Sequence, residues 1–166
     1  RVYARTVVFL EVSGAEAARL AALPALIYQP PGGGPDCYLL PPIRYPDGRH
    51  YLKIGGDPED RLLDGPAEID AWFRSGGDPE AAAFLEARLR ALLPGLPAGS
   101  VTRAPCVTAF TPTGEPVVAR QTDRIAALAG GNGAGAKCAD EIGRLGARLL
   151  MAAEAAPSEP VVGPVA

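Results

Sequence analysis

The chain has 166 residues, which is long enough for one full domain or for two partial domains that share a core. Its 16 lysines and arginines against 19 aspartates and glutamates give a net charge of −3, which argues against a nucleic-acid or anionic-membrane surface. No apolar run approaches the roughly 20 residues needed to cross a bilayer, and no signal-peptide pattern is present, so we expect a soluble, cytoplasmic protein.

Cysteine and histidine usage argues against a zinc site and against a disulfide scaffold. The three cysteines, Cys37, Cys106 and Cys138, are far apart and form no Cys-x-x-Cys pair, and His50 is the only histidine. Zinc sites combine several closely spaced cysteine or histidine ligands, and disulfide frameworks use an even number of cysteines. We therefore expect free thiols and no metal ion.

The first part of the chain is predicted to form strands connected by turns. Residues 2–12 are rich in β-branched and aromatic residues, which favours a strand. Residues 15–23 are alanine-rich and predict a short helix ended by a proline, and the Pro- and Gly-rich residues 29–36 predict a loop. Two further strands, 37–42 and 50–55, flank a Pro-Asp-Gly turn signal and predict a hairpin.

The second strand of this hairpin carries Lys53 between Leu52 and Ile54. Because successive side chains of a strand point to opposite faces, Lys53 lies on the face opposite to its two apolar neighbours. Periodicity favours an interpretation in which the apolar pair faces the core and the lysine faces solvent. The alternative is a lysine that points into a cavity, where a partly desolvated ammonium attracts an anion or a reduced oxygen species.

Two helical segments are predicted in the middle of the chain. Residues 57–77 are polar and turn-rich, with one helical turn at 67–73 around the only tryptophan, Trp72, for which we expect a packing role rather than ligand stacking. Asp78 matches an N-cap and a proline follows it, which predicts a helix over 79–93. The apolar residues of this helix are expected to form one buried stripe: Phe84, Leu85, Leu89, Leu92 and Leu93.

The last part of the chain is predicted to contain three strands, near 101–110, 116–119 and 124–128, followed by a glycine-rich loop and a helix. From residue 155 onward the Pro- and Ala-rich sequence has no periodicity, which predicts a disordered tail.

The glycine-rich stretch at 129–137 is the most informative segment. A strand, a glycine-rich turn and a helix together present backbone N–H groups and the positive helix end to an anion or an electron-rich oxygen. Lys137 lies at the helix start, where the dipole disfavours a cation, which suggests a ligand contact. Because Cys138 follows the lysine, the spacing is not that of a nucleotide-hydrolase phosphate loop, nor is it the Gly-x-Gly-x-x-Gly fingerprint. A small-residue surface loop that caps the helix is an equally good interpretation.

Three ordered segments point to a family. They are Tyr-Leu-Leu-Pro at 38–41 with Tyr-Leu-Lys-Ile-Gly-Gly at 51–56, Cys-Val-Thr-Ala-Phe-Thr-Pro-Thr-Gly at 106–114, and the glycine-rich stretch at 130–137 with Asp-Glu-Ile-Gly at 140–143. In this order they resemble the C-terminal half of FAD-dependent amine and amino-acid oxidases of the D-amino-acid oxidase superfamily. The branch of sarcosine and pipecolate oxidases and their dehydrogenase relatives is the most similar.

The resemblance implies roles for individual residues. Lys53 matches the family lysine that lies over the flavin and promotes the reaction of reduced flavin with oxygen, an electrostatic role. Cys106 is similar to the cysteine that forms a thioether to the flavin in some members, with a free thiol as the alternative. Lys137 matches the lysine that holds the substrate carboxylate, and Tyr38 resembles an aromatic residue of the substrate pocket. The cofactor contacts implied for the glycine-rich loop are Gly130, Gly131, Asn132, Gly133, Ala134, Gly135 and Lys137.

The implied fold class is α+β, with an antiparallel sheet and flanking helices, followed by the closing strands and C-terminal helix of a split FAD-binding domain. Residues 1–100 would form the substrate-binding region, 101–154 the C-terminal part of the FAD-binding domain, and 155–166 the disordered tail. The implied function is FAD-dependent oxidation of the C–N bond of a small amine or amino acid to an imine. A non-catalytic binding or regulatory module is the alternative.

Some features depart from this family pattern. Asp57 stands where sarcosine oxidases place a histidine shortly after the matching lysine, and Thr113-Gly114 stands where they usually have an aspartate, so the choice of substrate is open. The chain starts at Arg1 inside a predicted strand and contains no Gly-x-Gly-x-x-Gly unit. We therefore expect the ADP-binding half of the cofactor site to be carried by a separate or removed polypeptide.

Overall fold

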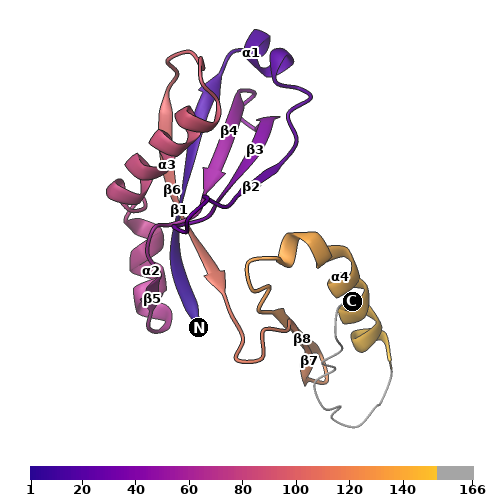
Figure 1. Ribbon diagram of the computed structural model, residues 1–166. Helices are drawn as coiled ribbons and strands as arrows, with labels where there is room; N and C mark the ends of the chain where they lie inside the picture. Colours follow the sequence, from indigo (N-terminus) through magenta and orange to yellow (C-terminus); the bar gives the residue numbers. More distant parts are fainter. Residues whose placement is uncertain (153–166) are drawn as a thin grey trace. The chain divides into compact units, whose positions relative to one another are not determined.

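The computed structural model describes residues 1–152, and the tail predicted for 155–166 lies outside the described residues. The chain divides into two compact units, which are described separately (Figure 1). We call Ala4–Val107 the sheet unit. The loop–helix unit combines Arg1–Tyr3 with the described residues from Thr108 onward. No helix within residues 1–152 is long and apolar enough to cross a membrane.

A six-stranded sheet is the framework of the sheet unit. Its strands are β1 (Val2–Val12), β2 (Leu26–Tyr28), β3 (Cys37–Arg44), β4 (His50–Gly55), β5 (Arg61–Leu63) and β6 (Val101–Ala109). The order is β2-β3-β4-β1-β5, with β6 also paired to β1, and the pairs β1/β4, β2/β3 and β3/β4 are antiparallel. These strands confirm the predicted first strand and the predicted hairpin. They also confirm the predicted antiparallel sheet of an α+β fold.

Three helices accompany this sheet: α1 (Gly14–Arg19), α2 (Gly65–Arg74) and α3 (Pro79–Leu92). α1 is shorter than the predicted helix because its C-cap, Leu20, already leaves helical geometry. α2 is longer than the single turn predicted. α3 begins where expected, since the Asp78 carboxylate accepts hydrogen bonds from the N–H groups of Glu80 (2.7 Å) and Ala81 (3.1 Å).

One face of the sheet packs against α3 and forms the core. Leu85 and Leu89 of α3 are fully buried against Leu52 and Ile54 of β4, and all four are 0% exposed. Burying each of these side chains stabilises the fold by about 1.5–3 kcal/mol relative to its exposure. The other members of the predicted stripe pack around this core as partly buried residues: Phe84, Leu92 and Leu93. The predicted alternation of β4 is therefore confirmed for its two apolar side chains.

The loop–helix unit contains a hairpin and one long helix. These elements are β7 (Val117–Thr122), β8 (Ile125–Ala129) and α4 (Gly135–Met151). β7 and β8 form their own antiparallel two-stranded sheet, whereas β6 pairs with β1. α4 packs closely against β8 at the buried residue Gly146. The missing side chain allows this packing, because a Cβ added there would lie 2.6 Å from the side chain of Leu128. The Arg120 guanidinium donates to carbonyl oxygens at the C-terminal end of α4, those of Leu149 and Ala152.

Candidate functional site

Lys53 lies on the sheet face opposite to the core packed against α3. It is paired with Phe9 of β1 on one side and with Leu40 of β3 on the other. Its Nζ lies 5.8 Å from the centroid of the Phe9 ring and 5.9 Å from that of the Tyr38 ring, within the range of cation–π attraction. Lys53 is half-buried. The ammonium is therefore held between two aromatic rings instead of extending freely into water.

Tyr38 is packed closely beside this lysine. It is the direct partner of Gly55 in the β3/β4 register, and a Cβ at Gly55 would lie 2.6 Å from the tyrosine ring. Burial raises the pKa of Tyr38 to about 12, with smaller contributions from the negative forms of Cys106, Tyr45 and Asp57. The phenol therefore stays neutral at physiological pH and can donate a hydrogen bond to a ligand.

The same sheet face continues from Lys53 as an aromatic cluster. Phe9, Tyr45 and Tyr51 contact one another edge-to-face, with ring centroids 5.5, 6.2 and 5.3 Å apart. The Tyr51 hydroxyl donates to the Asp47 carboxylate at 2.7 Å, so the far end of the cluster is polar. The aromatic cluster therefore reaches Lys53 through Phe9.

Cys106 is a half-buried free thiol on β6. Its Sγ makes a weak contact of 3.7 Å with the carbonyl of Val107, and its own carbonyl accepts a hydrogen bond from Trp72 Nε1 at 2.8 Å. Trp72 is only 5% exposed. The tryptophan therefore packs into the sheet unit, as predicted, and it holds the backbone of β6 at the cysteine.

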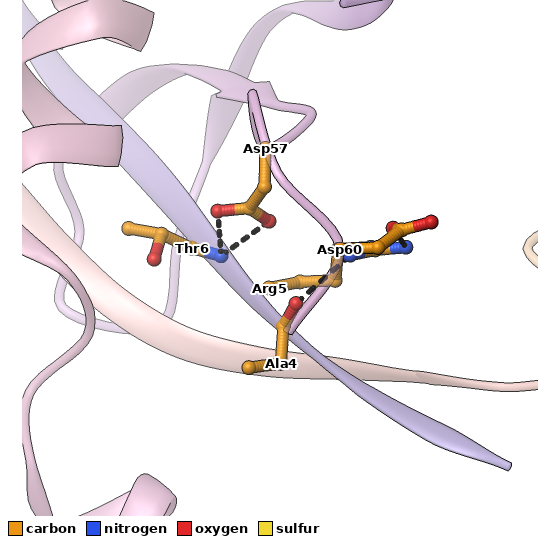
Figure 2. A network of polar contacts seen from close by, with 5 residues as sticks. All are labelled: Ala4, Arg5, Thr6, Asp57 and Asp60. Atoms are coloured by element: carbon orange, nitrogen blue, oxygen red, sulfur yellow. Dashed lines mark hydrogen bonds and ion pairs between the residues drawn. The ribbon is translucent and has the colours of Figure 1, made fainter. Parts of the chain in front are cut away.

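Asp57, at the position where the family pattern has a histidine, has a structural contact that the sequence did not reveal (Figure 2). Both of its carboxylate oxygens accept from the backbone N–H of Thr6, at 3.0 and 2.9 Å. Thr6 is fully buried, and its hydroxyl accepts from the N–H of Asp78 at 3.1 Å. Burial raises the pKa of Asp57, while the Thr6 hydrogen bond and the nearby Arg5 guanidinium oppose this increase. The Asp57 carboxylate thus accepts the hydrogen bond of a β1 N–H group that lies just beyond the last residue of β1 paired with β4.

A pocket of about 350 Å³ lies beside this network. Its lining residues include Arg61, whose guanidinium lies 5.5 Å from the centre of the Trp72 ring, and five acidic residues: Asp57, Glu59, Asp60, Asp78 and Glu80. Within residues 1–152 no group of histidines, cysteines and acidic residues could hold a metal ion. Lys53, Tyr38 and Cys106 do not line this pocket, so it is separate from the residues that the sequence singled out.

The glycine-rich loop of the loop–helix unit is fixed by Asn132. This residue has a positive φ of 49°, and its side-chain Oδ1 accepts from the N–H of Thr111 at 2.9 Å. Its Nδ2 donates to the carbonyls of Gly114 (2.9 Å) and Gly130 (2.6 Å). Gly130 also has a positive φ of 73°. The loop is therefore a defined turn, and the Asn132 amide is engaged by backbone groups of the chain itself.

The loop leads into a helix end without a side-chain cap. α4 has Ala134 at its N-cap and no acidic residue in its first turn, whereas α3 is capped by Asp78. Lys137 lies in this first turn and is exposed. The start of α4 therefore carries the positive end of the helix dipole, and Lys137 adds an exposed cation to the same turn.

The predicted site residues fall into two groups. Lys53, Tyr38 and Cys106 belong to the sheet unit, where the first two are in contact through the lysine ammonium. Lys137 and the glycine-rich loop belong to the loop–helix unit. The roles assigned to these residues from the resemblance stay predictions.

Comparison with known proteins identifies the family. The family model DAO, described as FAD dependent oxidoreductase, matches residues 4–149. Because this match spans most of the chain, the chain belongs to the FAD-dependent oxidoreductase family, whose members bind FAD. The comparison with curated proteins found no match. The α+β arrangement, with an antiparallel sheet and four helices within residues 1–152, is compatible with a domain of this family.

Proposed function

We propose that the chain is the C-terminal portion or a subunit of a flavin enzyme that oxidises the C–N bond of an amine or amino acid to an imine. The observation that carries the proposal is the family match over residues 4–149. The environment of Lys53 supports it, because a half-buried ammonium between two aromatic rings is suited to stabilising developing negative charge.

In this proposal the loop–helix unit would face the electron-rich edge of the flavin ring. The start of α4 has backbone donors and no side-chain cap, and a Cβ at Gly133 or Gly135 would meet no atom within 4 Å, so the approach to this backbone is open. Bound FAD would accept the hydride from the carbon next to the substrate nitrogen. In this proposal the loop N–H groups and Lys137 would hold the cofactor edge and the substrate carboxylate.

The residues of the sheet unit would supply charge and shape to the proposed reaction. Lys53 would provide a fixed positive charge toward reduced oxygen species, and the neutral Tyr38 phenol would contact the substrate. Cys106, a free thiol on β6, would be available for a covalent bond to the cofactor. None of these residues is required as a general base, because oxidation by hydride transfer needs only a neutral amine.

A partner polypeptide with the Gly-x-Gly-x-x-Gly half of the FAD site is part of the proposal, because the sequence contains no such motif. Exposed apolar residues of the loop–helix unit support it: Ile125, Leu128, Leu150 and Met151. Such a surface is typical of an interface. The same surface favours the second candidate, a non-catalytic module that holds a partner chain without flavin.

An absorbance spectrum of the protein purified from its native source separates the two candidates. We expect flavin absorbance together with a second polypeptide that carries the glycine fingerprint. If acid precipitation leaves the colour with the protein, the flavin is covalently bound, and Cys106→Ala should release it. A colourless chain, with or without a partner, would overturn the enzyme hypothesis and leave the binding module.

Two lysine variants then test the roles within the enzyme. Lys53→Met should lower the rate at which reduced flavin reacts with oxygen by about 100-fold, the cost typical of losing one electrostatic group at a reacting centre. Lys137→Met should instead weaken substrate binding and leave the oxygen reaction unchanged. Equal effects of both variants on the oxygen reaction would contradict the assignment.

A further inference from the structure

We infer that Phe9 and Tyr38 are positioning residues that hold the Lys53 ammonium at a fixed point above the sheet without neutralising its charge. We call Lys53 together with the rings of Phe9 and Tyr38 the lysine clamp. That the Lys53 charge acts on a reduced flavin or oxygen rests on the proposed function. The lysine clamp itself depends only on contacts within this chain.

The strand register brings the three residues of the lysine clamp together from three neighbouring strands. Phe9 of β1 is the direct partner of Lys53, so its ring lies next to the lysine side chain. Tyr38 of β3 is the partner of Gly55, which is two residues beyond Lys53 on the same face, so its ring approaches diagonally. The two distances from Nζ to the ring centroids, 5.8 and 5.9 Å, are nearly equal. The ammonium is therefore attracted from both sides.

Gly55 makes the diagonal approach possible. A Cβ at this position would lie 2.6 Å from two ring carbons and the hydroxyl oxygen of Tyr38, much closer than side-chain atoms approach one another. The φ of Gly55 is not in the left-handed region, so the glycine is not needed for the backbone conformation. The missing side chain instead leaves the space in which the tyrosine ring lies over β4.

The Lys53 ammonium is positioned by the two aromatic rings but forms no ion pair with a described carboxylate. Within residues 1–152 the described ion pairs are made by arginines and none includes Lys53. A carboxylate at this place would hold the lysine more strongly but would cancel its field. Aromatic faces attract a cation through their quadrupole and carry no net charge. The lysine clamp thus restricts a flexible side chain and leaves its positive charge available to an electron-rich ligand.

The composition of the chain allows a direct test. Lys53 and Lys137 are the only lysines, and Lys137 is exposed, so it is an internal reference. Reductive methylation of the full chain with ¹³C-formaldehyde labels both lysine side chains, together with the N-terminal amine, and keeps their positive charge. We expect the methyl signals of Lys53 to be shifted upfield by ring currents relative to those of Lys137. Coincident signals of the two lysines in the unmodified sequence would overturn the inference.

Variants assign the shift to the two rings. Phe9→Leu and Tyr38→Leu should each move the Lys53 signal part of the way toward that of Lys137, and Gly55→Ala should do the same by displacing the tyrosine ring. Phe9→Tyr and Tyr38→Phe keep a ring at each position and should restore the shift. Tyr45→Leu is the matched control, because Tyr45 contacts Phe9 but not Lys53. An unmoved Lys53 signal in Phe9→Leu and Tyr38→Leu, with native circular dichroism, would contradict the inference.

The same variants distinguish this inference from the proposed function. In a flavin-loaded preparation, Phe9→Leu should slow the reaction of reduced flavin with oxygen about tenfold while the KM for the reducing substrate stays unchanged, and Phe9→Tyr should restore the rate. If the methyl shift is present but the protein never binds flavin, the proposed function fails and the lysine clamp remains. If flavin binds but the shift is absent, only the lysine clamp is wrong.

Discussion

The two units of the chain differ in how they are stabilised. The sheet unit has a continuous core in which α3 covers one face of the sheet, and its central side chains are 0% exposed. Among the described residues with buried apolar side chains, only Val118 belongs to the loop–helix unit. In that unit Leu128 is 41% exposed and Met151 84% exposed. The hairpin of that unit therefore depends on its packing against α4, because an isolated two-stranded hairpin is at best marginally stable in water.

This difference separates two kinds of candidate site. Lys53 and Tyr38 lie on a sheet whose other face is anchored by the core, so their geometry is set by strand pairing. The glycine-rich loop depends on local hydrogen bonds made by Asn132 and on the contact of α4 with β8. We therefore expect substitutions in the sheet unit to affect global stability, and substitutions in the loop–helix unit to affect mainly that unit.

The largest effect is expected from Leu85→Ala. This side chain is 0% exposed, and its removal leaves a cavity between α3 and the sheet, so the free energy of unfolding should fall by about 2–5 kcal/mol. Leu128→Ala is the comparison in the loop–helix unit and should cost about 1 kcal/mol, because its side chain is already partly exposed. Denaturant titrations measure both. Equal losses would show that the two units share one core.

Asp57 tests a polar contact of the sheet unit. Asp57→Ala leaves the buried Thr6 N–H without its acceptor and should cost about 1–3 kcal/mol. Asp57→Asn keeps an acceptor oxygen and should be at least as stable as the natural sequence at neutral pH. Because burial raises the pKa of Asp57, the folded state binds its proton more tightly, and this contribution to stability is lost as pH rises through the folded pKa.

The pH dependence separates the two variants further. In Asp57→Asn this loss of stability with rising pH should disappear. Denaturant titrations between about pH 4 and pH 7 can detect the difference, because this range lies above the pKa of an ordinary carboxyl group. Identical pH profiles for the natural chain and Asp57→Asn would contradict a desolvated carboxylate at this position.

Two glycines of α4 test the packing of the loop–helix unit, with effects of opposite sign. Gly143→Ala meets no atom within 4 Å and should stabilise the helix by up to about 1 kcal/mol, the difference in helix propensity. Gly146→Ala gains the same propensity but places a Cβ 2.6 Å from Leu128, so the helix must move or the leucine must change rotamer. Hydrogen exchange of α4 amides measures the difference. A stabilising Gly146→Ala would show that α4 is not held against β8.

The smallest effect at neutral pH is expected for Tyr38→Phe, which keeps the ring and removes the hydroxyl. The pKa of Tyr38 is raised to about 12 in the folded state, above the ordinary tyrosine value of about 10. The stability that this difference supports is complete below the unfolded pKa and is lost as pH rises through the folded pKa. A tyrosinate absorbance titration should lose its latest step in Tyr38→Phe. If Tyr38→Phe instead removes a step near the ordinary tyrosine pKa, the Tyr38 ring is more exposed to water than its position beside Gly55 implies.

Much of the fold followed from local sequence signals. The strand at 2–12, the hairpin around the Pro-Asp-Gly turn and the helix after Asp78 depend on propensity, turn chemistry and capping, which act between near neighbours. The helix ends were less accurate: α1 stops at Arg19, and α2 is longer than a single turn. Such boundaries depend on packing as well as on propensity.

The site was predictable only in part. The pattern placed Lys53 opposite to Leu52 and Ile54, but it favoured solvent over an enclosed position for the lysine. The structure places the ammonium of the half-buried Lys53 beside Phe9 and Tyr38. No periodicity within one strand contains that information, because it depends on which residues of other strands are paired.

The sequence by itself determined most of the secondary structure elements, although not the short strands β2 and β5, and it determined the face on which Lys53 lies and the glycine-rich loop that opens α4. These features arise from backbone conformation and from alternation within single segments. Only the tertiary structure decided that β6 pairs with β1, that Asp57 accepts from Thr6, and that two rings hold Lys53. These contacts join residues far apart in the chain, and they exist because strand register and core packing are fixed together when the sheet forms.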